Sequence, residues 1–223
     1  MNDELKHMET DSKPRMRVEA VPVGSFQSNT YVVWEEGSKE AVVVDCGDEA
    51  ARIGGVLAAY SLEPKVLLLT HGHLDHAGGV RAFLERFDVP FYIHADELNV
   101  YRSIREQGAM FGMLIGEPPE PKNFLADGAE FSAAGLAFTV MHTPGHTPGS
   151  LCYLVRGMLF SGDVLFQGAV GRTDLPGGSS QQLMASLERL KALPPETIVF
   201  PGHGPSTTIA EELAHNPYLR GLY

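Results

Sequence analysis

The chain has 223 residues, of which 43% are hydrophobic, and 28 acidic against 17 basic side chains give it a formal charge of −11. This acidic balance argues against a general affinity for nucleic acid or for anionic membranes, because both need a basic surface. No apolar run approaches the roughly 18 residues of a membrane span, and two cysteines are too few for a disulfide framework.

The amino-terminal residues, MNDELKHMETDSKPRMR, are polar and lack the apolar stretch of a secretion signal. We therefore expect a disordered lead-in over residues 1–16, a single domain over residues 17–223 and a cytoplasmic location. Cys46 and Cys152 lie in apolar runs, which predicts that both are buried free thiols.

Strands and helices alternate through the first half of the chain. Short apolar runs predict strands, and apolar residues at helical spacing predict helices. In chain order, the predicted elements are strands at 18–23, 30–34 and 41–44, a helix at 50–60, a strand at 66–69, a helix at 79–87, a strand at 90–94 and a helix at 96–107. This alternation of strands and helices predicts an α/β protein with helices packed on the faces of its sheets.

The second half begins with a poorly periodic stretch and then returns to strands. Prolines 118, 119 and 121 predict a surface loop, since clustered prolines end helices. The later predicted elements are strands at 138–141, 150–155 and 158–160, a helix at 181–190, a strand at 197–200 and a short helix at 208–214.

A cluster of polar residues follows the predicted strand at 66–69, in the stretch LLLTHGHLDHAGGV. In extended backbone, residues two apart face the same way, so His71 and His73 can hold one ion together. Asp75 and His76 follow at the turn into the next helix and can point at a second ion. Nitrogen and carboxylate ligands of this kind suit zinc, iron or manganese.

Three later segments repeat the pattern of an apolar strand followed by a polar residue in a Gly- or Pro-rich turn. They carry His146 in HTPGHTPGS, Asp163 in LFSGDVLF and His203 in VFPGHGP. Such turns gather at strand ends, where sites form. Seven candidate ligands exceed the needs of one four-coordinate metal, whereas two metals sharing a carboxylate would use them all. The remaining histidines match no ligand position and are predicted to be surface or packing residues: His7, His94, His142 and His215.

The segment T-H-G-H-L-D-H resembles the H-x-H-x-D-H signature of the metallo-β-lactamase fold superfamily, and the later histidines and aspartate follow in the family's order. The resemblance implies a four-layer αββα sandwich with a dinuclear metal site at the sheet edge. It implies that one metal is bound by His71, His73 and His146, the other by Asp75, His76 and His203, with Asp163 as the bridge. Asp45, in VVVDCGD, closes an earlier strand and is predicted to hydrogen-bond a ligand imidazole and fix its tautomer.

Within the superfamily, the closing segment VFPGHGPSTTIAEELAHNPYL is similar to the end of short bacterial glyoxalase II-like hydrolases, whereas GAVGRTDLPGGS resembles these and persulfide dioxygenases alike. The resemblance implies a metal-dependent thioester hydrolase, namely a hydroxyacylglutathione hydrolase that uses a metal-bridging hydroxide, with Asp75 orienting it. Two divalent ions are expected, zinc first and iron or manganese as alternatives. A mononuclear iron persulfide dioxygenase and a catalytically idle metal-binding protein stay open as alternatives. Many true metallo-β-lactamases are exported and carry cysteine in place of Asp163, which argues against antibiotic hydrolysis.

The expected partner is a small, glutathione-derived thioester. Longer glyoxalase II enzymes bind glutathione with a helical carboxy-terminal domain, but only 20 residues follow His203 here. We therefore hypothesise that the segment 96–122 supplies a substitute wall, with Tyr101, Arg102, Arg105, Met110, Phe111 and Lys122 as substrate contacts. Arg172 and Asp174, in the GRTD turn, are predicted to pair with each other and brace the metal-binding loops.

Overall fold

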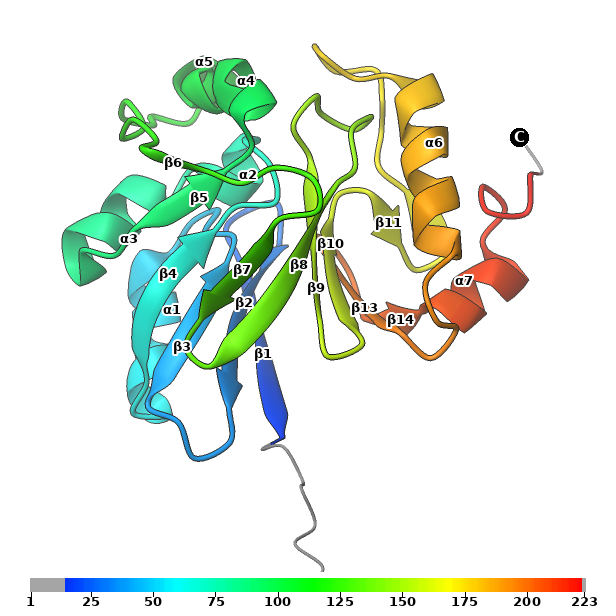
Figure 1. Cartoon of the computed structure of the whole chain (residues 1–223). Coiled ribbons are helices and arrows are strands. Elements are labelled where there is room, and N and C mark those ends of the chain that lie inside the picture. Colours follow the sequence, from blue (N-terminus) through cyan, green and yellow to red (C-terminus); the bar gives the residue numbers. More distant parts are fainter. Residues whose placement is uncertain (1–14, 222–223) are drawn as a thin grey trace, which may run out of the picture.

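Two six-stranded sheets face each other in the computed structural model, which describes residues 15–221 (Figure 1). Helices cover the outer face of each sheet, so the layers run helix, sheet, sheet, helix. The expected four-layer αββα sandwich is therefore confirmed. Most of the predicted disordered lead-in, residues 1–14, lies outside the described residues, whereas Met16 already pairs with Glu35 in the first sheet.

The first sheet is built by the amino-terminal half of the chain. In spatial order its strands are β1 (Met16–Val23), β2 (Ser28–Glu35), β3 (Glu40–Val44), β4 (Glu63–Leu68), β5 (Phe91–Ile93) and β6 (Asn123–Phe124). The strands from β3 to β6 are parallel. Its helices are α1 (Ala50–Ala59), α2 (Leu74–Ala77), α3 (Val80–Phe87), the 3₁₀ turn η1 (Ala95–Glu97), α4 (Leu98–Arg102) and α5 (Ile104–Met110). Parallel strands bring their carboxyl ends to one edge of the sheet, so the turns after β3, β4 and β5 meet there.

The carboxy-terminal half builds the second sheet. Its main strands are β7 (Glu130–Ala133), β8 (Leu136–His142), β9 (Leu151–Val155), β10 (Met158–Gly162), β13 (Ile198–Pro201) and β14 (Thr207–Thr208), in the spatial order β14-β13-β10-β9-β8-β7. A small hairpin of β11 (Leu165–Phe166) and β12 (Ala169–Val170) follows β10. Two helices cover the outer face: α6 (Ser180–Lys191) and α7 (Ile209–His215).

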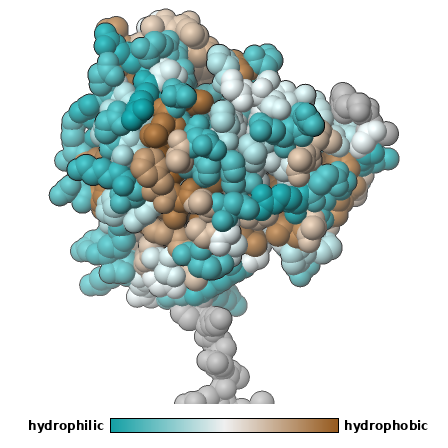
Figure 2. Space-filling model, turned by 45° about the horizontal axis from the view of Figure 1, so that its top comes forward, coloured by the Kyte–Doolittle hydropathy of each residue, from teal (hydrophilic) through white to brown (hydrophobic). Residues whose placement is uncertain are grey.

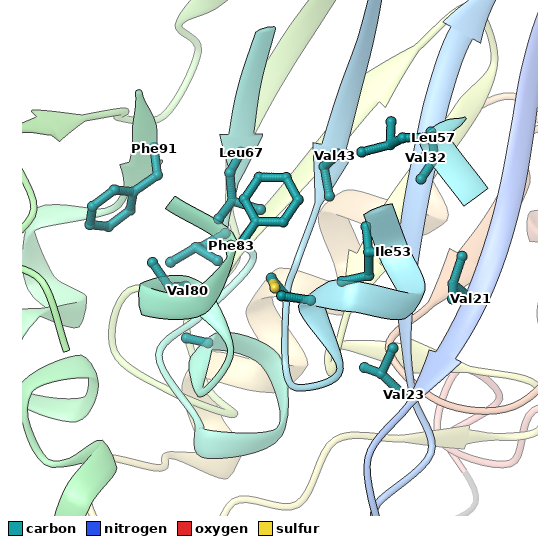
Figure 3. Packing of buried hydrophobic residues seen from close by; sticks show 14 of the residues in the cluster. Val21, Val23, Val32, Val43, Ile53, Leu57, Leu67, Val80, Phe83 and Phe91 are labelled. Carbon is teal, nitrogen blue, oxygen red and sulfur yellow. The ribbon is translucent and has the colours of Figure 1, made fainter. Parts of the chain in front are cut away.

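Alternating side chains along the strands fill three apolar layers. In β3, Val43 packs outward with α1 and α3, while Val42 and Val44 point into the space between the sheets. Figure 3 shows the outward layer, with Phe83 of α3 and Ile53 of α1 lying over the strands. Because strands buried on both faces need apolar residues at every position, the sequence pattern here is a run rather than an alternation.

One predicted helix is interrupted. The spacing predicts a single helix over 96–107, but the structure has η1, α4 and α5, with a break at Ser103. The hydroxyl of Ser103 donates to the carbonyl of Val100, and the Gln107 amide donates to both the Val100 carbonyl and the Ser103 hydroxyl. These side chains compete with the helical backbone bonds and redirect the chain.

The surface is mostly hydrophilic on the face shown in Figure 2, with apolar side chains reaching it between hydrophilic ones. Over residues 15–221, no helix combines the length and the apolar character needed to cross a bilayer. Cys46 and Cys152 are buried and free, as predicted.

Candidate metal centre

The first four candidate ligands lie where β4 ends and the chain turns into α2. His71 is 1% exposed and follows the strand by three residues, and the extended backbone of His73 leads directly into α2. Asp75 and His76 then occupy the single turn of this helix. The tight turn needs Gly72, since a Cβ there would lie 2.7 Å from the backbone nitrogen of Tyr101.

Asp45 fixes the orientation of two ligand imidazoles. It follows β3 in the left-handed region (φ 60°), and its Oδ2 lies 2.8 Å from Nδ1 of His76. The same carboxylate accepts hydrogen bonds from the backbone nitrogen and the hydroxyl of Thr70, both at 2.7 Å. That hydroxyl lies 3.0 Å from Nδ1 of His71. Since both imidazoles are held through Nδ1, their Nε2 atoms are left for a metal, which is the role predicted for Asp45.

The seven candidate ligands fall into two groups that adjoin each other. One group has ligand atoms within 4.8 Å of one another and consists of His71, His73 and His146; the second meets the same criterion and consists of Asp75, His76, Asp163 and His203. Asp163 touches both groups, with Oδ1 3.2 Å from Nε2 of His76 and Oδ2 3.6 Å from Nε2 of His146. A carboxylate in this position can bridge two ions.

One buried nitrogen at the centre, Nε2 of His71, has no hydrogen-bond partner, and Oδ1 of Asp163 faces only Nε2 of His76, at 3.2 Å. Buried polar atoms in folded proteins are nearly always paired. Both atoms carry lone pairs that can coordinate a divalent transition metal, and they belong to adjoining ligand groups. The residues therefore fit a pair of divalent ions at this edge.

The imidazole pKa values suit metal binding at the first group, whereas the pKa of His76 opposes it at the second. Burial, reinforced by His76 and His146, holds the pKa of His71 well below its usual range. Burial and His146 lower the pKa of His73 to about 4. Burial also acts to lower the pKa of His76, but the carboxylates of Asp163 and Asp75 outweigh it and raise that pKa. A metal entering the second group must therefore displace a proton from His76.

Sequence reasoning missed Glu97, which ties the two halves of the first group together. Its carboxylate is fully buried and accepts the backbone N–H of Gly72 at 2.9 Å and of Gly149 at 2.7 Å. Gly72 lies between two ligands, and Gly149 follows His146 on the opposite sheet. Burial raises the pKa of Glu97, and these hydrogen bonds oppose that rise. The only sequence signal was an acidic residue among the apolar positions of a short helix.

The prediction that Tyr101 contacts the substrate is wrong. Tyr101 is fully buried, and its hydroxyl donates to the carbonyl of Pro119, so it cannot contact a substrate. Tyr101 and Ile104 are three residues apart and form the buried face of the interrupted helix. Arg102 and Arg105 are exposed, as are Met110, Phe111 and Lys122, but both guanidiniums bind glutamates, Glu120 at 2.9 Å and Glu117 at 2.7 Å.

The remaining predicted residues lie around the centre rather than in it. Arg172 and Asp174 form a two-point ion pair at 2.7 Å, with both side chains more than half exposed. It is the backbone carbonyl of Arg172 that contacts a ligand, at 2.8 Å from Nδ1 of His146.

His94 and His142 stack with ring centroids 4.0 Å apart and planes at 12°. Parallel rings cannot aim their in-plane lone pairs at one ion, so this geometry argues for packing.

The fold and the two adjoining ligand groups together define an α/β protein with a candidate site for divalent metal ions. A model of the metallo-beta-lactamase superfamily matches residues 23–203, so the chain belongs to that superfamily. It is 38% identical over 210 residues to the hydroxyacylglutathione hydrolase GloC of Haemophilus influenzae, covering 92% of this chain and 98% of the relative.

Two solved structures are similar over nearly their whole length. One is a B3 metallo-beta-lactamase, BLEG-1, with 39% identity, a TM-score of 0.85 and coverage of 91% of this chain and 99% of that one. The other is TTHA1623 in a di-iron-bound form, with 41% identity, a TM-score of 0.84 and coverage of 91% and 100%. These similarities support a metal-dependent hydrolase whose His and Asp groups bind divalent metal ions.

Proposed function

We propose that the chain hydrolyses thioesters, with a hydroxyacylglutathione as the substrate class. The observation that carries the proposal is the pair of adjoining ligand groups, with Asp163 next to a histidine of each. Together the seven side chains offer enough ligands for two ions. When bound, two divalent ions lower the pKa of a water and stabilise the oxyanion that forms on an attacked carbonyl. The similarity to GloC points to the thioester class.

The chain's own residues position the reactants. Nε2 of His203 lies 3.0 Å from Oδ2 of Asp75, and His76 and His203 help to lower the pKa of that carboxyl although burial opposes them. Asp75 is therefore ionised at neutral pH, and its side chain keeps 20% exposure at the rim of the centre. It can accept a hydrogen bond from the attacking water and orient it. A thiolate leaves readily, so cleavage into acid and thiol needs no strong general acid.

The test follows S-D-lactoylglutathione by loss of its thioester absorbance. We expect turnover with metal-loaded protein and none after chelation or in His71→Ala. His215→Ala is the matched control, because this imidazole is 75% exposed on α7, and it should retain full activity. No turnover by protein that carries two ions would refute the proposal.

A β-lactam is the second candidate substrate, favoured by the likeness to BLEG-1. Its amide carbonyl would present the same electrophile to the centre. Nitrocefin assayed on the same preparation separates the two, since a thioesterase should cleave the thioester far faster. Oxygen uptake with glutathione persulfide tests the dioxygenase alternative, which needs one iron and leaves the second ligand group unused.

A further inference from the structure

His203, a candidate ligand of the second group, lies in a turn that has little rigidity of its own. It stands between Gly202 and Gly204 in the segment PGHGP at the end of β13, and glycine has the most backbone freedom of any residue. The imidazole of His203 is 31% exposed, so packing covers only part of it. A ligand in such a turn keeps its place only if other parts of the chain fix the turn from outside.

Asn29, the second residue of β2, supplies that support. It is 5% exposed, and its side-chain amide donates to carbonyls on both sides of His203, to that of Pro201 at 3.0 Å and to that of Gly204 at 2.9 Å. Its backbone N–H donates to the Gly202 carbonyl at 2.7 Å. One residue of the first sheet therefore binds three backbone carbonyls of a turn that follows a strand of the second sheet.

The preceding residue, Ser28, holds another member of the second group. It is 2% exposed, and its hydroxyl donates to the backbone carbonyl of Asp75. Gly47 packs against the same carbonyl, since a Cβ there would lie 1.6 Å from its oxygen. Asp75 and His203 in turn face each other, with Oδ2 and Nε2 3.0 Å apart. Two adjacent residues of one strand thus hold two candidate ligands that are 128 positions apart in the chain.

The strand that carries these contacts is a firm base. β2 lies between β1 and β3 and pairs with both, and the hydroxyl of Tyr31, two residues after Asn29, also donates to the Pro201 carbonyl, at 2.6 Å. Residues on regular strands place a site more precisely than residues on loops do. Within residues 15–221, the side chains of Ser28 and Asn29 hydrogen-bond to Asp75 and to the His203 turn and to neither loop of the first ligand group.

We propose that Ser28 and Asn29 are positioning residues for the second metal ion, Asn29 by holding His203 and Ser28 by holding Asp75. Both act through the ligands and not on the reacting atoms. The role is the same whichever bond the centre hydrolyses, so it does not depend on the thioester function. It also distinguishes the two ions: a change at the start of β2 should weaken the binding of the second and leave the first as it is.

The test titrates chelator-stripped protein with Zn²⁺ against a competing metal-binding dye, and His203→Ala identifies the binding step that belongs to the second group. Asn29→Ala should weaken the second ion about tenfold, the lower end of the range for a lost contact behind a ligand, because the Tyr31 hydroxyl still holds Pro201. Ser28→Ala should act in the same direction through Asp75. The first ion should keep its affinity in both variants.

Asn123→Ala is the matched control. It also removes a side-chain amide that donates to a backbone carbonyl, that of Phe91 at 3.2 Å, but in a strand that carries no candidate ligand. Both affinities should stay unchanged. Should Asn29→Ala not fold, Ser28→Ala decides by the same comparison of the two ions.

A double-variant cycle separates positioning from a general loss of stability. In a His203→Ala background the side chain that Asn29 positions is absent, so Asn29→Ala should weaken the remaining binding no further. The same loss in both backgrounds would overturn the role of Asn29. Equal weakening of both ions would overturn the proposal, and so would a second ion that binds the Asn29→Ala and Ser28→Ala variants as tightly as the unmodified protein. Because only Zn²⁺ binding is measured, failure of this proposal and absence of thioester turnover are distinguishable.

Discussion

Glu97 offers the sharpest test of how the metal centre is held. Its buried carboxylate receives two backbone N–H groups, one from the loop after β4 and one from the loop that carries His146. Glu97→Gln keeps the size of the side chain but exchanges one acceptor oxygen for an NH₂ group. One buried N–H then faces a donor and loses its bond.

The expected loss follows from those contacts. A hydrogen bond to a charged group contributes about 1.5–3 kcal/mol, so removing one of the two should lower the free energy of unfolding by about 2 kcal/mol. For a chain of this size that corresponds to a fall in Tm of about 4–8 °C. Because Gly72 lies between His71 and His73, the first ion should also bind more weakly, by about 10- to 100-fold.

Urea unfolding of chelator-stripped protein measures the stability, and competition with a metal-binding dye measures the affinity. Asp96→Asn is the control, since it makes the same acid-to-amide change on the adjacent residue, whose side chain is 65% exposed. It should shift stability by less than about 0.5 kcal/mol. If Glu97→Gln matches that control in both stability and metal affinity, the tethering role assigned to Glu97 is refuted.

Three further changes test the centre from other directions. Gly202→Ala should reduce turnover about 100-fold and expel the second ion, because its Cβ would lie 2.1 Å from Oδ1 of Asp163; full metal content, measured by mass spectrometry, would contradict this. Gly55→Ala, where a Cβ meets nothing within 4 Å, should leave metal content intact and stabilise α1 by up to about 1 kcal/mol. Metal titration should show weaker binding to the second group at about pH 6 than at pH 8, because a raised pKa keeps the competing proton on His76 as the pH falls; equal affinities would refute that competition.

The candidate ligands could be found from sequence because each has a local signal. His71 and Asp163 lie in turns that directly follow apolar strands. The fold brings the ends of these strands to one edge, so the two residues meet there. Glu97 has no such signal, since its role arises only when distant segments meet. Tyr101 shows the opposite error: it was predicted to contact the substrate, but it lies with Ile104 on the buried face of its helical segment.

The helix predicted over 96–107 also shows the limit of periodicity. The apolar spacing was correct for the buried face, but the Ser103 and Gln107 side chains bond to backbone groups within the same turn. Whether such bonds replace the helical ones depends on what packs above them, which a single sequence does not contain. The two-residue strands β6, β11, β12 and β14 were missed for a similar reason, because such short pairings carry no period, and the four-residue strand β7 was missed as well.

Each ligand group draws on both sheets: His71 and His73 come from the first and His146 from the second, and the second group is divided likewise. A bound ion is therefore a cross-link between the two halves of the sandwich, closing a loop of 73 residues between His73 and His146. Closing such a loop by a disulfide would reduce the entropy of the unfolded chain by an amount worth about 4 kcal/mol. An ion that binds only the folded chain acts on the same equilibrium, so chelation should loosen the sandwich as a whole and speed amide exchange in both sheets together.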